Sequence, residues 1–361
     1  MNRLDELMDY YQLKDEKAIE EMPIDEDEKQ RILHAVLEKA GLQEKEIVKT
    51  YSKNIRKRRL GILLAACISV FAMGAVGFAA VSLNGGMLSF FNPKSQEETE
   101  LLNSIGMIID KQVSANGLTI DVKEAVGDSN AVYVMFDIIA PEGMVLDKEQ
   151  YTFVTNNIQI GGAIGSYGMG YSFQELEDAN KTDNRIPMML CLSSSKKLVG
   201  ENMTISFEDF STYKTEEEMA TIPQMTEPGT AGDENDWYHI LIQGEWKITF
   251  PLNYKDNSLC WNVNQKISYK DMEVNVKQIR LSPISINMTL NNLDLKHHDV
   301  MEAPWLIHMK NGDVIDLNKC GRGAYTGSLK GTIIDAQFDQ IVRLEDVESI
   351  EFCGTIIPVK I

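Results

Sequence analysis

The stretch Gln112–Ala125 reads QVSANGLTIDVKEA and alternates apolar and polar residues on both sides of an Asn116-Gly117 pair. Alternation with a period of two is typical of a strand that buries one face. Asn-Gly is the dipeptide that two-residue hairpin turns favour, because both central positions of such a turn need positive φ. The stretch therefore predicts a β-hairpin, whose apolar positions are Val113, Leu118, Ile120 and Val122.

The same pattern returns 154 residues later, without a gap, at Lys266–Ile279 (KISYKDMEVNVKQI). The matched positions are Val113 and Ile267, Ser114 and Ser268, Leu118 and Met272, Ile120 and Val274, Val122 and Val276, and Lys123 and Lys277. Beyond the hairpin, Val132, Val134 and Phe136 correspond to Ile286, Met288 and Leu290. Any two strands share a period of two, so chance alternation is the alternative. The ungapped length of the match favours two related β domains in tandem.

Further short strands are expected after each hairpin. In the first β domain, residues 111–255, they are Tyr151–Ile160, Arg185–Leu192, Met203–Phe207 and Trp237–Leu252. In the second, residues 256–361, they are Trp305–Met309, Val314–Leu317, Thr332–Phe338 and Ile350–Val359. Short strands separated by turns, with almost no helix, predict a mainly β exported part made of two tandem β-sandwich-like domains.

A long apolar stretch precedes these domains. Leu60–Leu83 is 24 residues of almost unbroken apolar side chains. As a helix it would be about 36 Å long, enough to cross a hydrocarbon core of about 30 Å. A buried core helix would keep a polar face, and a secretory signal peptide would open the chain rather than follow 59 residues. We therefore predict a single transmembrane helix at residues 60–83.

Basic residues crowd the front end of this span and orient it. They form a collar of Lys53, Arg56, Lys57, Arg58 and Arg59. Because Lys and Arg are retained on the cytoplasmic side, we expect a single-pass protein of the cell membrane with a cytoplasmic N-terminus and an extracellular C-terminus. Residues 84–110 would form a membrane-proximal stalk, with one helix over Glu97–Ile109.

The cytoplasmic segment, residues 1–59, is acidic and helical in pattern. An amphipathic helix is expected over Asp25–Ala40, with Gly41 as its stop signal. The apolar stripe includes Ile32, Leu33, Val36 and Leu37. Such a narrow stripe cannot form a core by itself, so the helix either binds a partner or pairs with its neighbour as a plain spacer.

The chain carries a net charge of −19, from 54 acidic and 35 basic residues. A surface of this sign repels nucleic acid, and no basic stripe with interleaved aromatic residues offsets it. Ser193–Lys196 has the S-x-x-K order of serine acyl-enzymes but lacks the companion motifs, so it is interpreted as a polar turn. His297-His298-Asp299 has no third ligand at a supporting spacing. We expect no catalytic, cofactor-binding or metal-binding site, and no enzyme activity.

Four of the five cysteines lie in the exported part: Cys191, Cys260, Cys320 and Cys353. An even number permits two disulfides, with three possible pairings. A domain of this size does not need such bridges, so free buried thiols are the simpler interpretation.

The order of these parts resembles one protein family. An acidic cytoplasmic segment, a Lys/Arg collar and a single span precede KQVSANGLTIDV at Lys111–Val122 and the related stretch Lys266–Pro283. This arrangement is similar to the membrane-anchored anti-sigma-factor-like proteins of Gram-positive bacteria, whose ectodomain pairs two domain families of unknown function. The resemblance implies a cytoplasmic end that holds an extracytoplasmic-function sigma factor and an outer end that senses. The His-x-x-x-Cys-x-x-Cys zinc motif of many anti-sigma domains is absent.

Two functions are therefore compatible with the sequence. In the first, the exported β domains detect an envelope signal, and the cytoplasmic segment releases its sigma factor after proteolysis at the membrane by an intramembrane protease. In the second, the tandem domains are an adhesion or wall-binding module that the inner segment merely anchors. The amphipathic helix Asp25–Ala40 favours the first.

Overall fold

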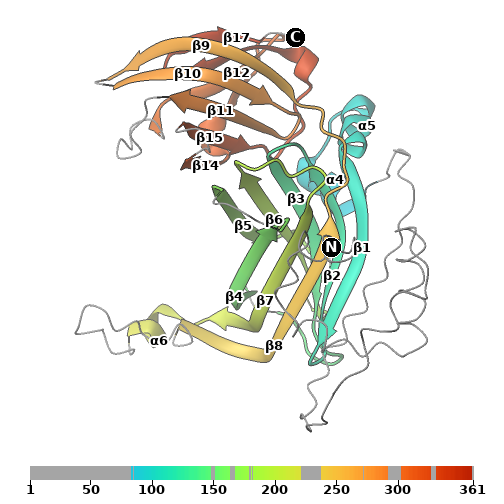
Figure 1. Cartoon of the computed structure of the whole chain (residues 1–361). Coiled ribbons are helices and arrows are strands. Elements are labelled where there is room, and N and C mark those ends of the chain that lie inside the picture. Colours follow the sequence, from blue (N-terminus) through green and yellow to red (C-terminus); the bar gives the residue numbers. More distant parts are fainter. Residues whose placement is uncertain are drawn as a thin grey trace, which may run out of the picture. The chain divides into compact units, whose positions relative to one another are not determined.

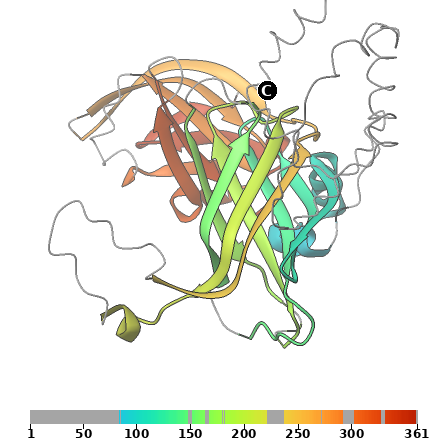
Figure 2. The same ribbon diagram turned by 60° about the horizontal axis from the view of Figure 1, so that its bottom comes forward.

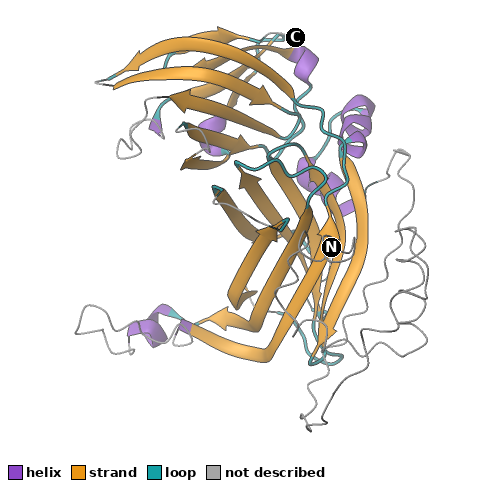
Figure 3. Cartoon of the chain, viewed as in Figure 1, coloured by secondary structure: helices purple, strands orange, loops and turns teal. Residues whose placement is uncertain are grey.

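The computed structural model describes residues 83, 85–147, 151–162, 167–178, 180, 182–220, 237–270, 272–291, 302–326 and 331–359. This part of the chain is mainly β, as the sequence predicts, with four antiparallel sheets and few helices (Figures 1, 2 and 3). None of the helices in it has the length and apolar character that crossing a membrane requires. The predicted cytoplasmic segment and the predicted span, except Leu83, lie outside the described residues.

Two sheets make up the first β region, residues 106–251. The larger sheet has the order β1-β2-β3-β6-β5, and the smaller has the order β4-β7-β8. The strands are β1 (Gly106–Ala115), β2 (Leu118–Gly127), β3 (Ala131–Ile139), β4 (Tyr151–Ile160), β5 (Met169–Glu175), β6 (Arg185–Ser194), β7 (Asn202–Tyr213) and β8 (Tyr238–Pro251). A short helix, α6 (Glu216–Ala220), follows β7.

The second β region, residues 259–358, again has two sheets. Their orders are β14-β15-β11-β10-β9 and β13-β12-β16-β17. The strands are β9 (Leu259–Tyr269), β10 (Met272–Leu281), β11 (Ser285–Asn291), β12 (Trp305–Met309), β13 (Val314–Asp316), β14 (Gly321–Thr326), β15 (Thr332–Gln337), β16 (Val347–Phe352) and β17 (Thr355–Pro358). Two 3-10 turns, η3 (Leu317–Lys319) and η4 (Leu344–Asp346), connect them.

The two five-stranded sheets are copies of each other in strand order and in register. Val113 pairs with Ile120 in the first hairpin, and Ile267 pairs with Val274 at the corresponding place in the second. A β-bulge interrupts β2 between Val122 and Glu124, and another interrupts β10 between Val276 and Gln278, which is the same position in the repeat. The predicted hairpins and their correspondence are therefore confirmed, since chance alternation would not reproduce a bulge.

Each region encloses an apolar cluster to which both of its sheets contribute. In the first region, Phe153 of β4 stacks on Phe207 of β7 with ring centroids 4.4 Å apart, and Phe207 also meets Phe136 of β3. Trp246 of β8 is fully buried, and its indole N–H donates to the Leu118 carbonyl at 3.0 Å. In the second region, Trp305 and Phe352 pack edge to face in a cluster drawn from residues 259–359. The strand alternation thus buries one face of each sheet against its partner sheet.

The residues assigned by sequence to a stalk fold onto the β regions instead of standing apart. Helix α4 spans Gly85–Phe91 and helix α5 spans Gln96–Ser104. The Ser95 hydroxyl caps α5 by accepting the Glu98 N–H at 3.2 Å. The predicted helix to Ile109 is wrong at its end, because Gly106 already pairs with Val126 as part of β1. Ladder pairing with β2 overrides the local helical pattern there.

A third apolar cluster joins the two β regions through these N-terminal residues. Leu83, Met87 and Phe91 are buried in it, together with Tyr133 and Met189 on the outer face of the first sheet. Ile284 and Ile341 of the second region belong to the same cluster. The outer face of the first five-stranded sheet is therefore covered, and the cover extends across the boundary between the regions.

Candidate functional site

The most concentrated buried polar chemistry among the described residues lies where two equivalent turns meet. The turn Asp128–Ala131 joins β2 to β3, and the turn Ser282–Ser285 joins β10 to β11 at the same position of the repeat. Both turns close with the same backbone bond, at 2.9 Å from Asp128 N to Ala131 O and at 2.8 Å from Ser282 N to Ser285 O. The two turns thus have one geometry.

The side chain at the first position caps each turn. Asp128 Oδ1 accepts the N–H groups of Asn130 and Ala131, each at 2.7 Å. Ser282 Oγ accepts the N–H groups of Ile284 at 3.1 Å and Ser285 at 2.9 Å. A carboxylate and a hydroxyl therefore perform the same local task, which is the ordinary role of Asp and Ser in turns.

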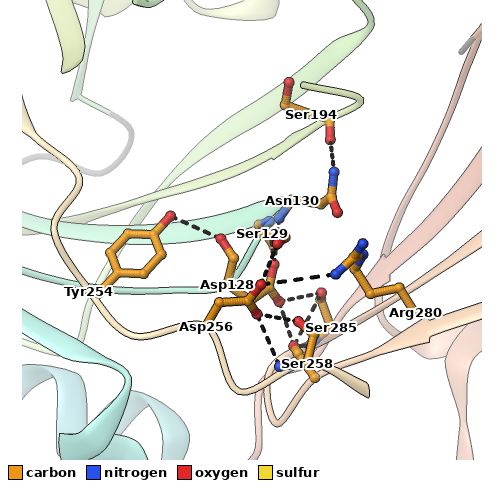
Figure 4. A network of polar contacts seen from close by, with 11 residues as sticks. Asp128, Ser129, Asn130, Ser194, Tyr254, Asp256, Ser258, Arg280 and Ser285 are labelled. Atoms are coloured by element: carbon orange, nitrogen blue, oxygen red, sulfur yellow. Dashed lines mark hydrogen bonds and ion pairs between the residues drawn. The ribbon is translucent and has the colours of Figure 1, made fainter. Parts of the chain in front are cut away.

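The two caps also bind each other across the boundary (Figure 4). Asp128 Oδ2 accepts a hydrogen bond from Ser282 Oγ and a second from Ser285 Oγ at 2.6 Å. All three side chains are at most 1% exposed. Burial raises the pKa of Asp128, although the bonds from Ser282, Ser285 and the turn N–H groups act in the opposite direction. Asp128 thus carries four hydrogen bonds in a site without water access.

A second carboxylate, Asp256, lies beside this contact in the segment that links β8 to β9 (Figure 4). It accepts hydrogen bonds from Ser129 Oγ of the first region and from the Ser258 N–H at 3.0 Å, and Arg280 lies 3.9 Å away. Burial acts to raise the pKa of Asp256, but the hydrogen bonds from Ser129 and Ser258 hold it below its usual value. The link between the regions is therefore bonded to both of them.

Tyr254 fixes the same link from the other side. Its hydroxyl donates to the Asp128 carbonyl at 3.1 Å, and its ring packs so close to Gly127 that a Cβ there would not fit. Burial raises the pKa of Tyr254 well above its ordinary value, so this hydroxyl stays a donor. A glycine is required at position 127 because the tyrosine ring occupies the side-chain space.

A reciprocal contact lies further along the boundary and centres on Asp335 of β15. This carboxyl belongs to the second region, and the serine that hydrogen-bonds it, Ser193, belongs to the first. Asp335 is 2% exposed, and its Oδ1 has no hydrogen-bond partner among the described residues. Tyr325 of β14 abuts the backbone at Gly168, and its hydroxyl donates to Asn287 Oδ1 at 3.3 Å. Each region thus presents a buried carboxyl to serines of the other.

The pKa of Asp335 lies well above the ordinary value of an aspartate. Burial raises the pKa of Asp335 to about 6, and the negative charge of Asp128 contributes in the same direction. The hydrogen bond from Ser193 and the charge of Arg322 act to lower it. The two buried carboxyls are therefore coupled, and each disfavours the charge of the other.

Two direct bonds complete the boundary. Gln337 Nε2 donates to the Leu192 carbonyl at 3.0 Å, and the Tyr133 hydroxyl donates to the Phe338 carbonyl at 2.6 Å. The boundary therefore combines direct hydrogen bonds with two buried carboxyls, Asp128 and Asp335, that can bind a proton. Among the described residues, no group of three or more His, Cys, Asp or Glu side chains could hold a metal ion.

Most residues that the sequence singles out lie outside the described ranges. These are the stripe Ile32, Leu33, Val36 and Leu37, the collar Lys53, Arg56, Lys57, Arg58 and Arg59, and the group His297, His298 and Asp299. Cys191, Cys260, Cys320 and Cys353, which the sequence assigns to the predicted exported part, are all described, and all are free thiols.

The polar turn expected over Ser193–Lys196 is confirmed only for Ser195 and Lys196, because Ser193 and Ser194 are the last residues of β6. Lys196 pairs with Glu201 at 3.2 Å. Ser193 bonds Asp335, and the Ser194 carbonyl accepts Asn130 Nδ2 at 2.8 Å. One sequence feature is related to the boundary between the β regions, because the repeat aligns Asp128 with Ser282. An alignment of two copies does not indicate that the copies touch.

Comparison with known proteins adds little to this geometry. No protein-family model and no curated protein matches the chain. One solved structure, described as "the crystal structure of the conserved domain protein from Bacillus anthracis", is similar to it at 13% identity and a TM-score of 0.45. The similarity covers 68% of this chain and 75% of that one. A likeness this distant carries no functional argument.

Proposed function

We propose that the chain is a single-pass membrane regulator. In this proposal its cytoplasmic segment sequesters an extracytoplasmic-function sigma factor, and its exported part, two tandem β-sandwich-like domains, senses an envelope signal. It has no enzyme activity and needs no cofactor. The N-terminus is cytoplasmic and residues 60–83 form the transmembrane helix.

One observation carries this proposal. Leu83, the last residue of the predicted span, and Met87 and Phe91, which follow it, are buried in one apolar cluster with Ile284 and Ile341 of the second β region. A passive anchor would need only a tether, whereas here the residues next to the span pack where the two regions meet. A rearrangement of that boundary would therefore change the packing of the segment that leads into the membrane.

The cytoplasmic half of the proposal rests on the predicted stripe Ile32, Leu33, Val36 and Leu37. This face has the size of one helix-in-groove contact, in which a few central apolar side chains dominate the binding energy. Release of the sigma factor would follow cleavage of the span by an intramembrane protease, once the exported part has changed state.

The test replaces Leu33 and Leu37 by Asp in the full chain. Burying unpaired charges in an apolar groove costs several kcal/mol, so affinity for the sigma factor should fall by orders of magnitude and its target genes should become constitutively active. The control Lys39→Ala changes the opposite face and should leave both measurements unchanged. Co-purification of the double variant with the sigma factor and unaltered transcription would move the assignment to the adhesion or wall-binding module.

The topology is tested separately. Cys260 is exposed in the second β region. A membrane-impermeant thiol reagent added to intact cells should label this cysteine, and Cys260→Ser should remove that label. Labelling only after the cells are opened would contradict an extracellular C-terminal part.

A further inference from the structure

We propose that the boundary between the two β regions is a proton-operated latch, closed when Asp335 is protonated and loosened when Asp335 carries its charge beside Asp128. The latch itself is a property of the described residues. Its meaning as the sensing step rests on the regulatory function proposed above.

Both carboxyls lie at the boundary, so separation of the regions would remove hydrogen-bond donors from each of them. Asp128 receives hydroxyl donors from Ser282 and Ser285 of the second region, and Asp335 receives one from Ser193 of the first. When the regions separate, each carboxyl exchanges these donors for water. Ionisation and separation are therefore linked, because water solvates a carboxylate far better than a buried site does.

The two carboxyls are not equally satisfied. The Asp128 carboxylate accepts four hydrogen bonds, whereas Asp335 Oδ1 has no hydrogen-bond partner among the described residues. A buried carboxyl oxygen without a hydrogen-bond donor costs more free energy when the group is charged than when it is neutral, so the half-satisfied site fits the neutral form of Asp335. The neutral form also removes the repulsion between the two buried groups.

The charged and titratable groups around Asp335 do not supply a compensating partner. Tyr325 faces it from β14, and burial raises the pKa of this tyrosine beyond the range in which it ionises. Arg322 precedes Gly323, the residue that pairs with Asp335, and therefore points to the other face of the sheet, with its guanidinium 5.3 Å from the Trp305 ring. Asp128 is the group that faces Asp335 from the first region, and it bears the same charge.

The direction of the pH effect follows from these surroundings. Burial in the docked state raises the pKa of Asp335 from its ordinary 3.8 to about 6. Separation would expose this carboxyl to water on the side of the first region, so the docked state binds the proton more tightly than the separated state. Protonation of Asp335 stabilises the docked boundary fully at a pH below the ordinary pKa of 3.8, and this stabilisation is lost as the pH rises through about 6. Each unit by which separation lowers the pKa of Asp335 would change the docking equilibrium constant about tenfold.

The test measures solvent access at the boundary in the full chain, held in lipid nanodiscs. Tyr325 is 8% exposed and lies on the boundary, while Tyr151 is 6% exposed inside the first region and serves as a matched internal reference. Hydroxyl-radical footprinting should oxidise Tyr325 severalfold more at pH 7.5 than at pH 5, with Tyr151 unchanged.

Two variants assign the effect to Asp335. Asp335→Asn imitates the neutral acid and should hold Tyr325 at its low oxidation at both pH values. Ser193→Ala removes the bond that lowers the pKa of Asp335, so the midpoint of the Tyr325 profile should move to higher pH. The exposed Glu348→Gln in the same region should keep the wild-type profile.

Equal oxidation of Tyr325 at both pH values in the wild type would overturn the latch. So would a pH-dependent rise that persists in Asp335→Asn. If Asp335→Asn fails to fold, the wild-type profile and the Ser193→Ala midpoint still decide the matter. Because footprinting does not involve the sigma factor, a failed latch and a failed regulatory function are distinguished by separate measurements.

Discussion

Asp128 and Ser282 occupy the same position in the two repeats, and the serine hydroxyl donates to the aspartate carboxylate across the boundary between the β regions. The repeat thus produces two equivalent turns that bind each other. The two copies differ at this position, so that one supplies a hydrogen-bond acceptor and the other a donor. Two aspartates would repel each other, and two serines would offer no carboxylate to accept the four hydrogen bonds.

Exchange of the two side chains tests this complementarity. Ser282→Asp places a second carboxylate against Asp128, and we expect it to reduce stability by about 3 kcal/mol or more. The double variant Asp128→Ser with Ser282→Asp should recover most of that loss, because either side chain can cap either turn. Denaturant midpoints of the four proteins in the cycle measure the coupling, and additive effects would contradict it.

Trp246 should be the most sensitive tryptophan of the first region. Trp246→Phe leaves a cavity and removes the bond to the Leu118 carbonyl, so unfolding should become easier by about 2–4 kcal/mol. Trp237→Phe is the matched control, because Trp237 is 55% exposed, and its effect should stay within about 0.5 kcal/mol. Thermal melting of both variants provides the comparison. Equal effects would mean that the indole bond has no energetic role.

Thiol reactivity should distinguish the exposed Cys260 from the other three described cysteines. Burial raises the pKa of Cys191 to about 12, and raises those of Cys320 and Cys353 to about 11. At pH 8 these three remain protonated, and the thiolate is the reactive form, so only the exposed Cys260 should react rapidly. A chromogenic disulfide reagent, followed by mass spectrometry of the modified peptides, identifies the fast site. Rapid modification of Cys353 in the folded protein would contradict its burial.

The second β region should fold by itself. Its apolar cluster is drawn from residues 259–359, so the fragment Ser258–Ile361 retains that core. We expect β-type circular dichroism and a cooperative melt. In this fragment the pKa of Asp335 should return toward its ordinary value, because the first region no longer buries it. If this fragment does not fold while Asn84–Ile361 does, the two β regions form one merged folding unit.

The strand pattern was predictable because a hairpin is a local structure. The alternation around Asn116-Gly117 specifies both strands of β1–β2, and the match at Lys266–Ile279 extends that prediction to β9–β10. The end of the helix after Glu97 was not predictable in this way. Gly106 joins β1 because its ladder partner Val126 lies in the next strand, and a local pattern does not include that partner.

The hydrogen-bonded boundary between the two β regions was harder to predict than the fold. Asp128 and Ser193 are ordinary turn and strand-end residues in the sequence, and the S-x-x-K stretch to which Ser193 belongs indicates only a polar turn. Their role depends on how the two β regions meet in three dimensions, which a local sequence pattern does not specify. The repeat offset aligned Asp128 with Ser282, and only the three-dimensional arrangement shows that this alignment is also a contact.

The tyrosine over Gly127 determines how the two regions can move. Tyr254 leaves no space above that glycine and bonds the next residue, and Asp256 accepts a hydrogen bond from Ser129, so the connecting segment is held beside the Asp128 turn. Any opening of the boundary must therefore turn about a fixed pivot beside Asp128. In such a motion displacement grows with distance from the pivot, so the contact of Gly168 with Tyr325 separates before the paired turns do.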